Sequence, residues 1–257
     1  MSEENLRKMQ KILVTNDDGI AAPGLRALVG ALEGVATVYV VAPDRERSAA
    51  AQSLTLLEPV FYAQAAEREW SVEGTPADAV ILALNKLLPE RPDLVLSGIN
   101  NGGNLGENVY YSGTVAAAME GCINGIPACA ISLTGKRKDP DFSGAAKFAR
   151  ALAELALKEP LPKGVMLNAN VPGKWNGAVR LTRQSPKITR NVLKDGTDPR
   201  GRTFVWLSEQ KHIDESEPDT DYAAVIAGCV SLTPLELDRT HAEFLNHLSH
   251  WAAHLTK

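Results

Sequence analysis

Short apolar runs alternate with longer segments of helical period over roughly the first 175 residues, and this rhythm constrains the fold more than any other feature. The predicted strands are residues 11–15, 36–42, 93–97, 128–133 and 165–171. The predicted helices between them are residues 25–32, 75–88, 114–123 and 143–157. Because strands and helices alternate, the pattern predicts a doubly wound, mostly parallel α/β sheet with helices on both faces.

Two of the predicted helices begin with residues that favour a helix start. Thr75 can cap the helix at 75–88, and Pro76 stands at the first helical position, where proline is tolerated. Ser143 is expected to cap the helix that follows it in the same way.

After about residue 180 the alternation stops. Residues 180–184, 203–208 and 224–235 resemble strands, and no helical segment joins them, so we expect them to pair antiparallel as hairpins. Residues 241–254 return to helical spacing. The sequence therefore predicts an α/β core at residues 1–178, followed at 179–257 by a β-hairpin extension and a C-terminal helix. With no helix to cover them, these strands are expected to pair with another copy of the chain.

Composition limits the class of partner and the compartment. The formal net charge of −4 leaves no overall basic surface for a long nucleic acid, so an anionic ligand must be held locally. Three cysteines without CxxC spacing indicate free thiols in a reducing compartment. The first ten residues are polar, and no apolar run approaches the ~20 residues that cross a bilayer. We expect a cytoplasmic protein with no membrane partner.

The ends of the predicted strands carry the polar residues of interest, because open parallel sheets bind ligands at that edge. Asp17 and Asp18 follow the first strand. Adjacent carboxylates repel each other, and a hard cation such as Mg²⁺ or Mn²⁺ would keep both ionised in a cleft. On its own, however, the sequence NDDG is more typical of a simple turn.

The segment at residues 97–114, SGINNGGNLGENVYYSGT, is harder to explain as a plain connection. It carries five glycines and four asparagines directly after a predicted buried strand. Glycines let backbone amides approach a ligand, and Ser112-Gly113-Thr114 opens a helix whose N-terminus can bind an anion. The alternative is a long surface loop with a capping residue, but long glycine-rich loops in compact domains are usually functional.

Several segments together resemble the SurE survival protein family, which comprises 5′/3′-nucleotidases also described as acid phosphatases. They are ILVTNDDGIAAPGL, VVAPDRERSAAAQSLTL, VEGTPADAV, PDLVLSGINNGGNLGENVYYSGTVAAAMEG and VSLTPL. The match is dense over the first 135 residues and thinner in the C-terminal part. It implies a Rossmann-like core and a metal-dependent phosphomonoesterase acting on nucleoside 5′- and 3′-monophosphates, with hydrolysis of short-chain polyphosphate as a further activity.

The resemblance also implies roles for particular residues. The ligands of one divalent metal ion per subunit, Mg²⁺ or Mn²⁺, would be Asp17, Asp18, Ser48 and Asn100. The residues around the phosphate would be Asn104, Ser112, Gly113 and Thr114. A homodimer or homotetramer through an exchanged C-terminal extension is implied as well.

The sequence departs from the family pattern at two places. A GTD segment common in the family reads PDTD here, at residues 218–221. An Asp and a His that stand four apart in many members are three apart here, as Asp238 and His241. These differences leave the role of the Asp238–His241 pair open.

The residues alone leave the chemical step open between two mechanisms. Asp17 or Asp18 either orients and deprotonates an attacking water or attacks phosphorus itself. An aspartyl-phosphate phosphatase is disfavoured because its DxD spacing is missing, and a dinucleotide oxidoreductase because the first strand lacks GxGxxG. A nucleotide-binding sensor without turnover is the remaining alternative. Two carboxylates beside an anion argue against it, because a sensor gains nothing from them.

Overall fold

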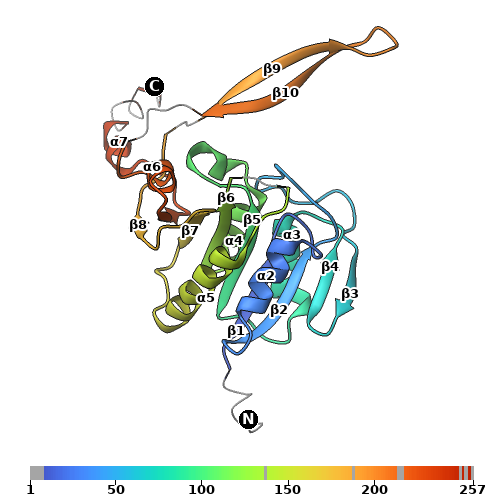
Figure 1. Ribbon diagram of the computed structural model, residues 1–257, viewed down its shortest axis with the longest axis vertical. Coiled ribbons are helices and arrows are strands. Elements are labelled where there is room, and N and C mark those ends of the chain that lie inside the picture. Colours follow the sequence, from blue (N-terminus) through green and yellow to red (C-terminus); the bar gives the residue numbers. More distant parts are fainter. Residues whose placement is uncertain are drawn as a thin grey trace.

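Nine strands of the computed structural model form one sheet in the order β3-β4-β2-β1-β5-β6-β7-β11-β8 (Figure 1). The structure describes residues 9–135, 138–186, 189–212, 217–248, 251 and 254–255. The central strands are β1 (Lys11–Thr15), β2 (Thr37–Pro43), β5 (Leu94–Asn101), β6 (Ala128–Thr134) and β7 (Val165–Pro172). Neighbouring members of this group pair parallel, which confirms the mostly parallel sheet predicted from the sequence.

Helices cover both faces of this sheet. The helices α2 (Pro23–Ala31) and α5 (Ser143–Lys158) bury Leu25 and Phe148 in the cluster that contains Ile12 of β1. On the opposite face, α3 (Pro76–Leu82) and α4 (Gly113–Ile123) pack in the cluster that contains Leu13. Since successive residues of β1 enter opposite clusters, the strand is buried on both sides, and the doubly wound arrangement is confirmed.

The helix boundaries agree with the predicted starts in one case and differ in the other. Thr75 caps α3, accepting from the backbone N–H of Asp78, and α3 continues into a π-helical segment, η1 (Ala83–Leu87). The prediction that Ser143 caps α5 is wrong. Ser143 is the first helical residue, its N–H donates to the carboxylate of Asp141, and the cap position is occupied by Phe142.

A short antiparallel hairpin that the sequence analysis did not predict extends one edge of the sheet. It consists of β3 (Tyr62–Ala66) and β4 (Glu69–Val72), and β4 joins β2 in parallel. At the other edge, β11 (Val230–Glu236) pairs antiparallel with β7, and β8 (Val179–Leu181) pairs parallel with β11.

These pairings correct the sequence-based prediction for the C-terminal part. Residues 180–184 and 224–235 do not form antiparallel hairpins, because β8 and β11 complete the main sheet and residues 221–226 form the helix α6 (Asp221–Ile226). Thr220 caps α6 by accepting from the N–H of Ala223. Sheet pairing therefore crosses the division proposed after residue 178, and that division stays a prediction.

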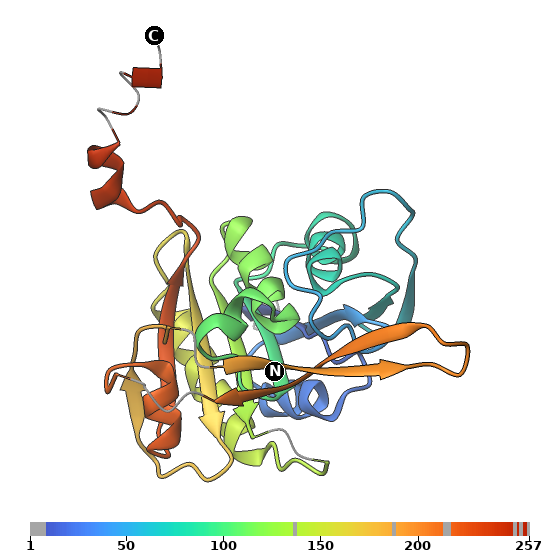
Figure 2. The same ribbon diagram turned by 90° about the horizontal axis from the view of Figure 1, so that it is seen from above.

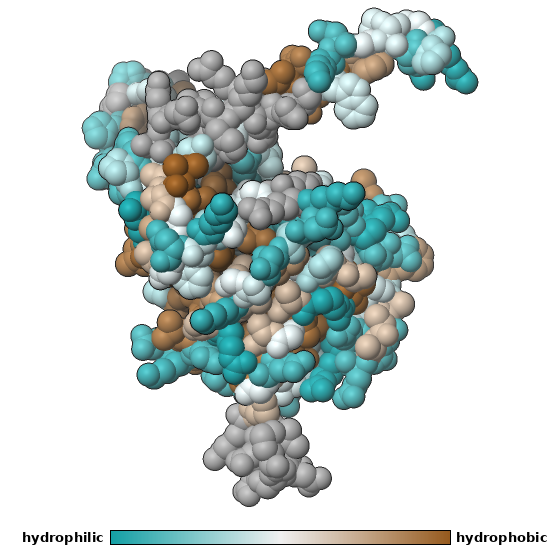
Figure 3. Space-filling model, viewed as in Figure 1, coloured by the Kyte–Doolittle hydropathy of each residue, from teal (hydrophilic) through white to brown (hydrophobic). Residues whose placement is uncertain are grey.

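One true hairpin projects from the body. It is formed by β9 (Thr189–Thr197) and β10 (Thr203–His212), which make a separate two-stranded sheet (Figures 1 and 2). Apolar residues lie along the hairpin, and its tip is more polar (Figure 3). The C-terminal helix α7 covers Ala242–His247, and the rest of the predicted tail helix lies partly outside the described residues. No helix in the described part of the chain is long and apolar enough to cross a membrane.

Candidate active site

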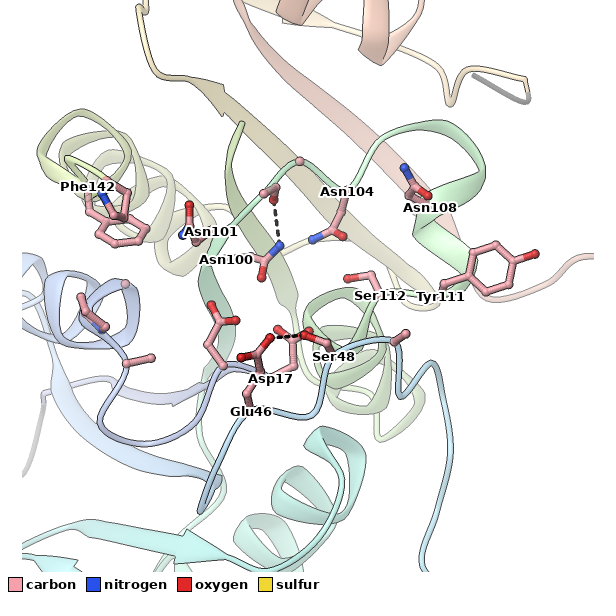
Figure 4. A pocket seen from close by; sticks show the side chains of 18 of the residues that line it. Asp17, Glu46, Ser48, Asn100, Asn101, Asn104, Asn108, Tyr111, Ser112 and Phe142 are labelled. Carbon is pink, nitrogen blue, oxygen red and sulfur yellow. Dashed lines mark hydrogen bonds between the residues drawn. The ribbon is translucent and has the colours of Figure 1, made fainter. Parts of the chain in front are cut away.

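A cleft of about 930 Å³ opens where the loops after β1, β2 and β5 meet at the carboxyl edge of the sheet. The predicted site residues that line it are Asp17, Asp18, Ser48, Asn100, Asn104 and Ser112. Figure 4 shows five of them, Asp17, Ser48, Asn100, Asn104 and Ser112, which come from several loops and face a common opening. The two other predicted residues, Gly113 and Thr114, form the first turn of α4 and pack directly against Asp17.

Local hydrogen bonds shape the turn that carries the two aspartates. The side chain of Asn16 accepts from the N–H of Gly19 at 3.2 Å and donates to its carbonyl at 3.0 Å. Gly19 has a φ of 102°, a conformation that favours glycine. The N–H of Arg47 donates to the carbonyl of Asp17 at 2.8 Å, which ties the loop after β2 to the turn after β1. The NDDG segment therefore does form the turn that its sequence favours, and this turn also brings the two aspartates to the cleft.

Asp17 lies in an electrostatically unfavourable position. Its side chain is only 7% exposed. The pKa of this carboxyl is raised to about 6, chiefly by burial; the hydrogen bond donated by the Thr114 hydroxyl opposes the shift, and the charge of Asp18 adds to it. A buried carboxylate beside a second carboxylate is stabilised by a cation, which supplies compensating positive charge.

The start of α4 comes unusually close to Asp17. A Cβ at Gly113 would lie 2.7 Å from the Cβ of Asp17, so any larger residue would displace the carboxylate or the helix. Ser112 caps α4 by accepting from the N–H of Val115 at 3.1 Å. This cap leaves the helix N-terminus facing the cleft, where its backbone N–H groups and positive end suit an anion.

The donor set fits a hard divalent ion. Asp17 and Asp18 offer carboxylates, and Ser48 offers a hydroxyl that donates to Glu46. The amide nitrogen of Asn100 donates to the carbonyl of Gly102 at 2.8 Å, so its oxygen is the atom suited to a metal (Figure 4). Among the described residues no group of three or more His, Cys, Asp or Glu side chains could hold a metal. An ion here would therefore bind two carboxylates, neutral oxygens and water, as Mg²⁺ does.

The cleft also contains residues that the sequence analysis did not assign to it. Glu46 lines it, although a run of charged residues such as the one after β2 is usually solvated. Phe142 and Tyr111 contribute aromatic side chains to the lining. Thr189 and Leu207 come from the projecting hairpin. The position of Glu46 after a predicted strand indicates that it belongs to the cleft. Thr189 and Leu207 are distant in sequence from the strand ends, and no sequence pattern indicates that they reach the cleft.

The two departures from the family pattern lie in different surroundings. The carboxylate of Asp238 accepts from the N–H of Thr240, and the ring of His241 accepts from the N–H of Phe244, so both side chains make local bonds in an exposed segment. Asp221 of the PDTD segment is fully buried instead. Its carboxylate accepts from the N–H of Gly106 at 3.0 Å and thus contacts the loop that follows β5.

Comparison with known proteins agrees with this arrangement. The model of the family described as "Survival protein SurE" matches residues 12–191. A protein of Desulforudis audaxviator named "5′-nucleotidase SurE" is 48% identical over 250 residues, covering 94% of this chain and 97% of that protein. A protein of Vibrio cholerae with the same name is 45% identical over 245 residues, covering 94% of this chain and 97% of that protein.

A solved structure shows the same fold. The crystal structure of the SurE protein from Aquifex aeolicus superposes with a TM-score of 0.85 at 39% sequence identity. The match covers 94% of this chain and 99% of that chain, so it includes the C-terminal part as well as the sheet.

Proposed function

Because the chain belongs to the SurE survival protein family, we propose that it is a 5′-nucleotidase that uses a divalent metal ion to hydrolyse nucleoside monophosphates to nucleoside and phosphate. The proposal extends to nucleoside 3′-monophosphates and to short-chain polyphosphate. The observation that carries it is the buried carboxylate of Asp17, which lies beside Asp18 and receives the hydroxyl of Thr114 at the start of α4. Groups suited to a cation and groups suited to an anion thus adjoin in one cleft.

The metal would be held by Asp17, Asp18, Ser48 and Asn100, with one ion, Mg²⁺ or Mn²⁺, in each subunit. When bound, it supplies positive charge that neutralises the phosphoryl oxygens. The chain's own contribution is to hold four oxygen donors from three loops in one place. The bond from the Arg47 N–H to the Asp17 carbonyl and the bond from Asn100 to Gly102 support this positioning.

The phosphate would be bound by Asn104, Ser112, Gly113 and Thr114. Backbone N–H groups at the start of α4, including that of Thr114, and the hydroxyl of Ser112 are suited to the phosphate oxygens, while the Thr114 hydroxyl donates to Asp17. One of the two aspartates then orients and deprotonates an attacking water or attacks phosphorus itself. In either case the P–O ester bond breaks and the leaving nucleoside oxygen takes up a proton. If the aspartate attacks, water then hydrolyses the aspartyl phosphate, which frees the aspartate and inorganic phosphate.

The size and charge of the cleft favour small substrates. A volume of about 930 Å³ accommodates a mononucleotide, and the net charge of −4 gives no basic stripe to hold a long polyanion. We therefore propose small phosphomonoesters as substrates, in preference to internal phosphodiester bonds of RNA or DNA.

The test is phosphate release by the purified protein from p-nitrophenyl phosphate, nucleoside 5′- and 3′-monophosphates and short-chain polyphosphate. Each is assayed with EDTA and then with Mg²⁺ or Mn²⁺ restored. We expect turnover that EDTA abolishes and the metal restores, and little cleavage of RNA or DNA. Binding of nucleotide without turnover would indicate a sensor. Activity that EDTA leaves unchanged would contradict the metal mechanism.

A further inference from the structure

One face of β7 becomes polar where the strand approaches the cleft. Ala169 and Val171 of this strand enter the apolar cluster on the side of α2 and α5. On the other face, Met166 enters the opposite cluster, but Asn168 and Asn170 follow it, and both are fully buried. Strands buried on both faces are usually apolar throughout, and a buried carboxamide is costly unless it is hydrogen-bonded. These two asparagines therefore need a structural explanation.

The carboxamide of Asn170 pairs with both backbone polar groups of a single loop residue. Its Oδ1 accepts from the N–H of Asn104 at 2.8 Å, and its Nδ2 donates to the carbonyl of Asn104 at 3.1 Å. The Asn170 side chain thus makes the two bonds to the Asn104 backbone that a residue of a neighbouring β-strand would make. Asn168 strengthens the arrangement, since its Nδ2 donates to the same carbonyl at 2.8 Å.

The side chain of Asn104 is oriented from the same buried layer. Its Nδ2 donates to Oγ of Ser132 at 2.8 Å, and Ser132 lies opposite Asn170 in the pairing of β6 with β7. Asn104 is therefore fixed at its backbone N–H, its carbonyl and its side chain. This matters because it follows Gly102 and Gly103, which give the loop after β5 little conformational restraint of its own.

We infer that Asn170 is a positioning residue that sets the place of Asn104 in the cleft, with Asn168 in a supporting role. The inference rests on the proposed function, in which Asn104 binds the substrate phosphate. Without Asn170, the glycine-containing loop can shift Asn104 away from the phosphate, and a displacement of about 1 Å can cost about 100-fold in rate. The carboxamides are thus buried to hold a binding residue in place.

The first test is Asn170→Ala compared with Ser231→Ala. Ser231 is a matched control because it lies opposite Asn170 on β11, is equally buried, and has no hydrogen-bond partner for its hydroxyl among the described residues. For Asn170→Ala we expect kcat/KM to fall about 10- to 100-fold. The KM for a nucleoside monophosphate and the inhibition constant for inorganic phosphate should both rise about 10-fold. For Ser231→Ala we expect all three within about twofold of the unmodified protein.

The second test is a double-mutant cycle with Asn104→Ala. If Asn170 acts through Asn104, adding Asn170→Ala to Asn104→Ala changes the phosphate inhibition constant little further. An undiminished effect in that background would overturn the inference, as would an Asn170→Ala protein that behaves like Ser231→Ala. If Asn170→Ala does not fold, Asn168→Ala is compared with Ser231→Ala in its place. Should Asn104→Ala itself leave phosphate inhibition unchanged, the proposed phosphate role of Asn104 fails instead.

Discussion

The hydroxyl of Thr114, in the first turn of α4, donates a hydrogen bond to the carboxylate of Asp17 at the end of β1. Both side chains are buried, and the contact joins elements that are 97 residues apart in sequence. It connects the proposed phosphate-binding helix start directly to the proposed metal ligand. A substitution of Thr114 should therefore alter the ionisation of Asp17.

Replacing Thr114 by Val removes this hydrogen bond while preserving the shape of the side chain. Because the bond lowers the pKa of Asp17, its loss should raise that pKa further. We expect kcat/KM at neutral pH to fall about 10-fold, and the acidic limb of its pH profile to move to higher pH. Thr114→Ser keeps the hydroxyl and is the control. A Val variant with the profile of the unmodified protein would contradict this role.

Asp17→Asn removes a buried charge and keeps the size of the side chain. Phosphatase activity should fall at least about 100-fold, the scale expected when a main electrostatic contributor is lost. Circular dichroism serves as the folding control. Asn100→Ala should raise the Mn²⁺ concentration needed for activity, and it should change the circular dichroism spectrum little. An active Asp17→Asn protein would contradict the metal mechanism.

The same substitution should stabilise the metal-free protein in a pH-dependent way. The pKa of Asp17 is about 6 in the fold against 3.8 for an unperturbed aspartate, so the folded form binds the proton more tightly. The contribution of Asp17 to stability is therefore fully present below about pH 4 and is lost as the pH rises through 6, by up to about 3 kcal/mol. Denaturant unfolding should show Asp17→Asn more stable at pH 7.5 and similar near pH 4. Saturating Mn²⁺ should reverse the order at pH 7.5.

Asp221 should be important for stability because it joins the C-terminal part to the loop that follows β5. Its carboxylate accepts from the backbone N–H of Gly106, Ser185 and Tyr222 and from the Ser185 hydroxyl. Asp221→Ala should lower the free energy of unfolding by about 2–4 kcal/mol, since buried donors lose their acceptor. Asp219→Ala is the matched control. Its ion pair with Arg183 is exposed, so its loss should cost about 0.5 kcal/mol or less. Equal losses would contradict the assignment.

The parallel strands could be predicted from sequence because burial on both faces demands continuous β-branched and apolar residues. β1 and the start of β6 agree with the prediction to the residue, and the strand-end rule selected residues that do line one cleft. That rule works because parallel strands bring their carboxyl ends to the same edge. It selects positions and does not by itself assign a chemical role to any of them.

The remaining features depend on tertiary contacts that leave no local pattern. Residues 224–226 are apolar and two of them are β-branched, yet the cap at Thr220 and the buried Asp221 make them helical. β9 is polar and forms a strand because β10 pairs with it. Asn170 was predicted only as part of a strand, since its bond to Asn104 spans 66 residues.

The projecting hairpin carries an apolar surface that a single chain leaves exposed. Phe204, Val205, Trp206 and Leu207 are all exposed, and Leu193 lies opposite Leu207 on the paired strand. Consecutive residues of a strand point to opposite faces, so both faces of the hairpin are apolar. Exposed apolar surface of this kind marks an interface. We therefore predict that residues 179–257 mediate assembly with another copy of the chain, as a homodimer or homotetramer.

Size-exclusion chromatography with light scattering at micromolar concentration tests this assembly. We expect a dimeric or tetrameric mass for the unmodified protein and a smaller mass for Trp206→Glu combined with Val205→Glu, which places a charge on each face of the hairpin. Leu155→Glu is the matched control, because Leu155 is similarly exposed but lies on α5 of the core. It should leave the mass unchanged. An interface at the hairpin would be contradicted by a strictly monomeric unmodified protein. It would also be contradicted if Leu155→Glu lost assembly while the hairpin variant kept it.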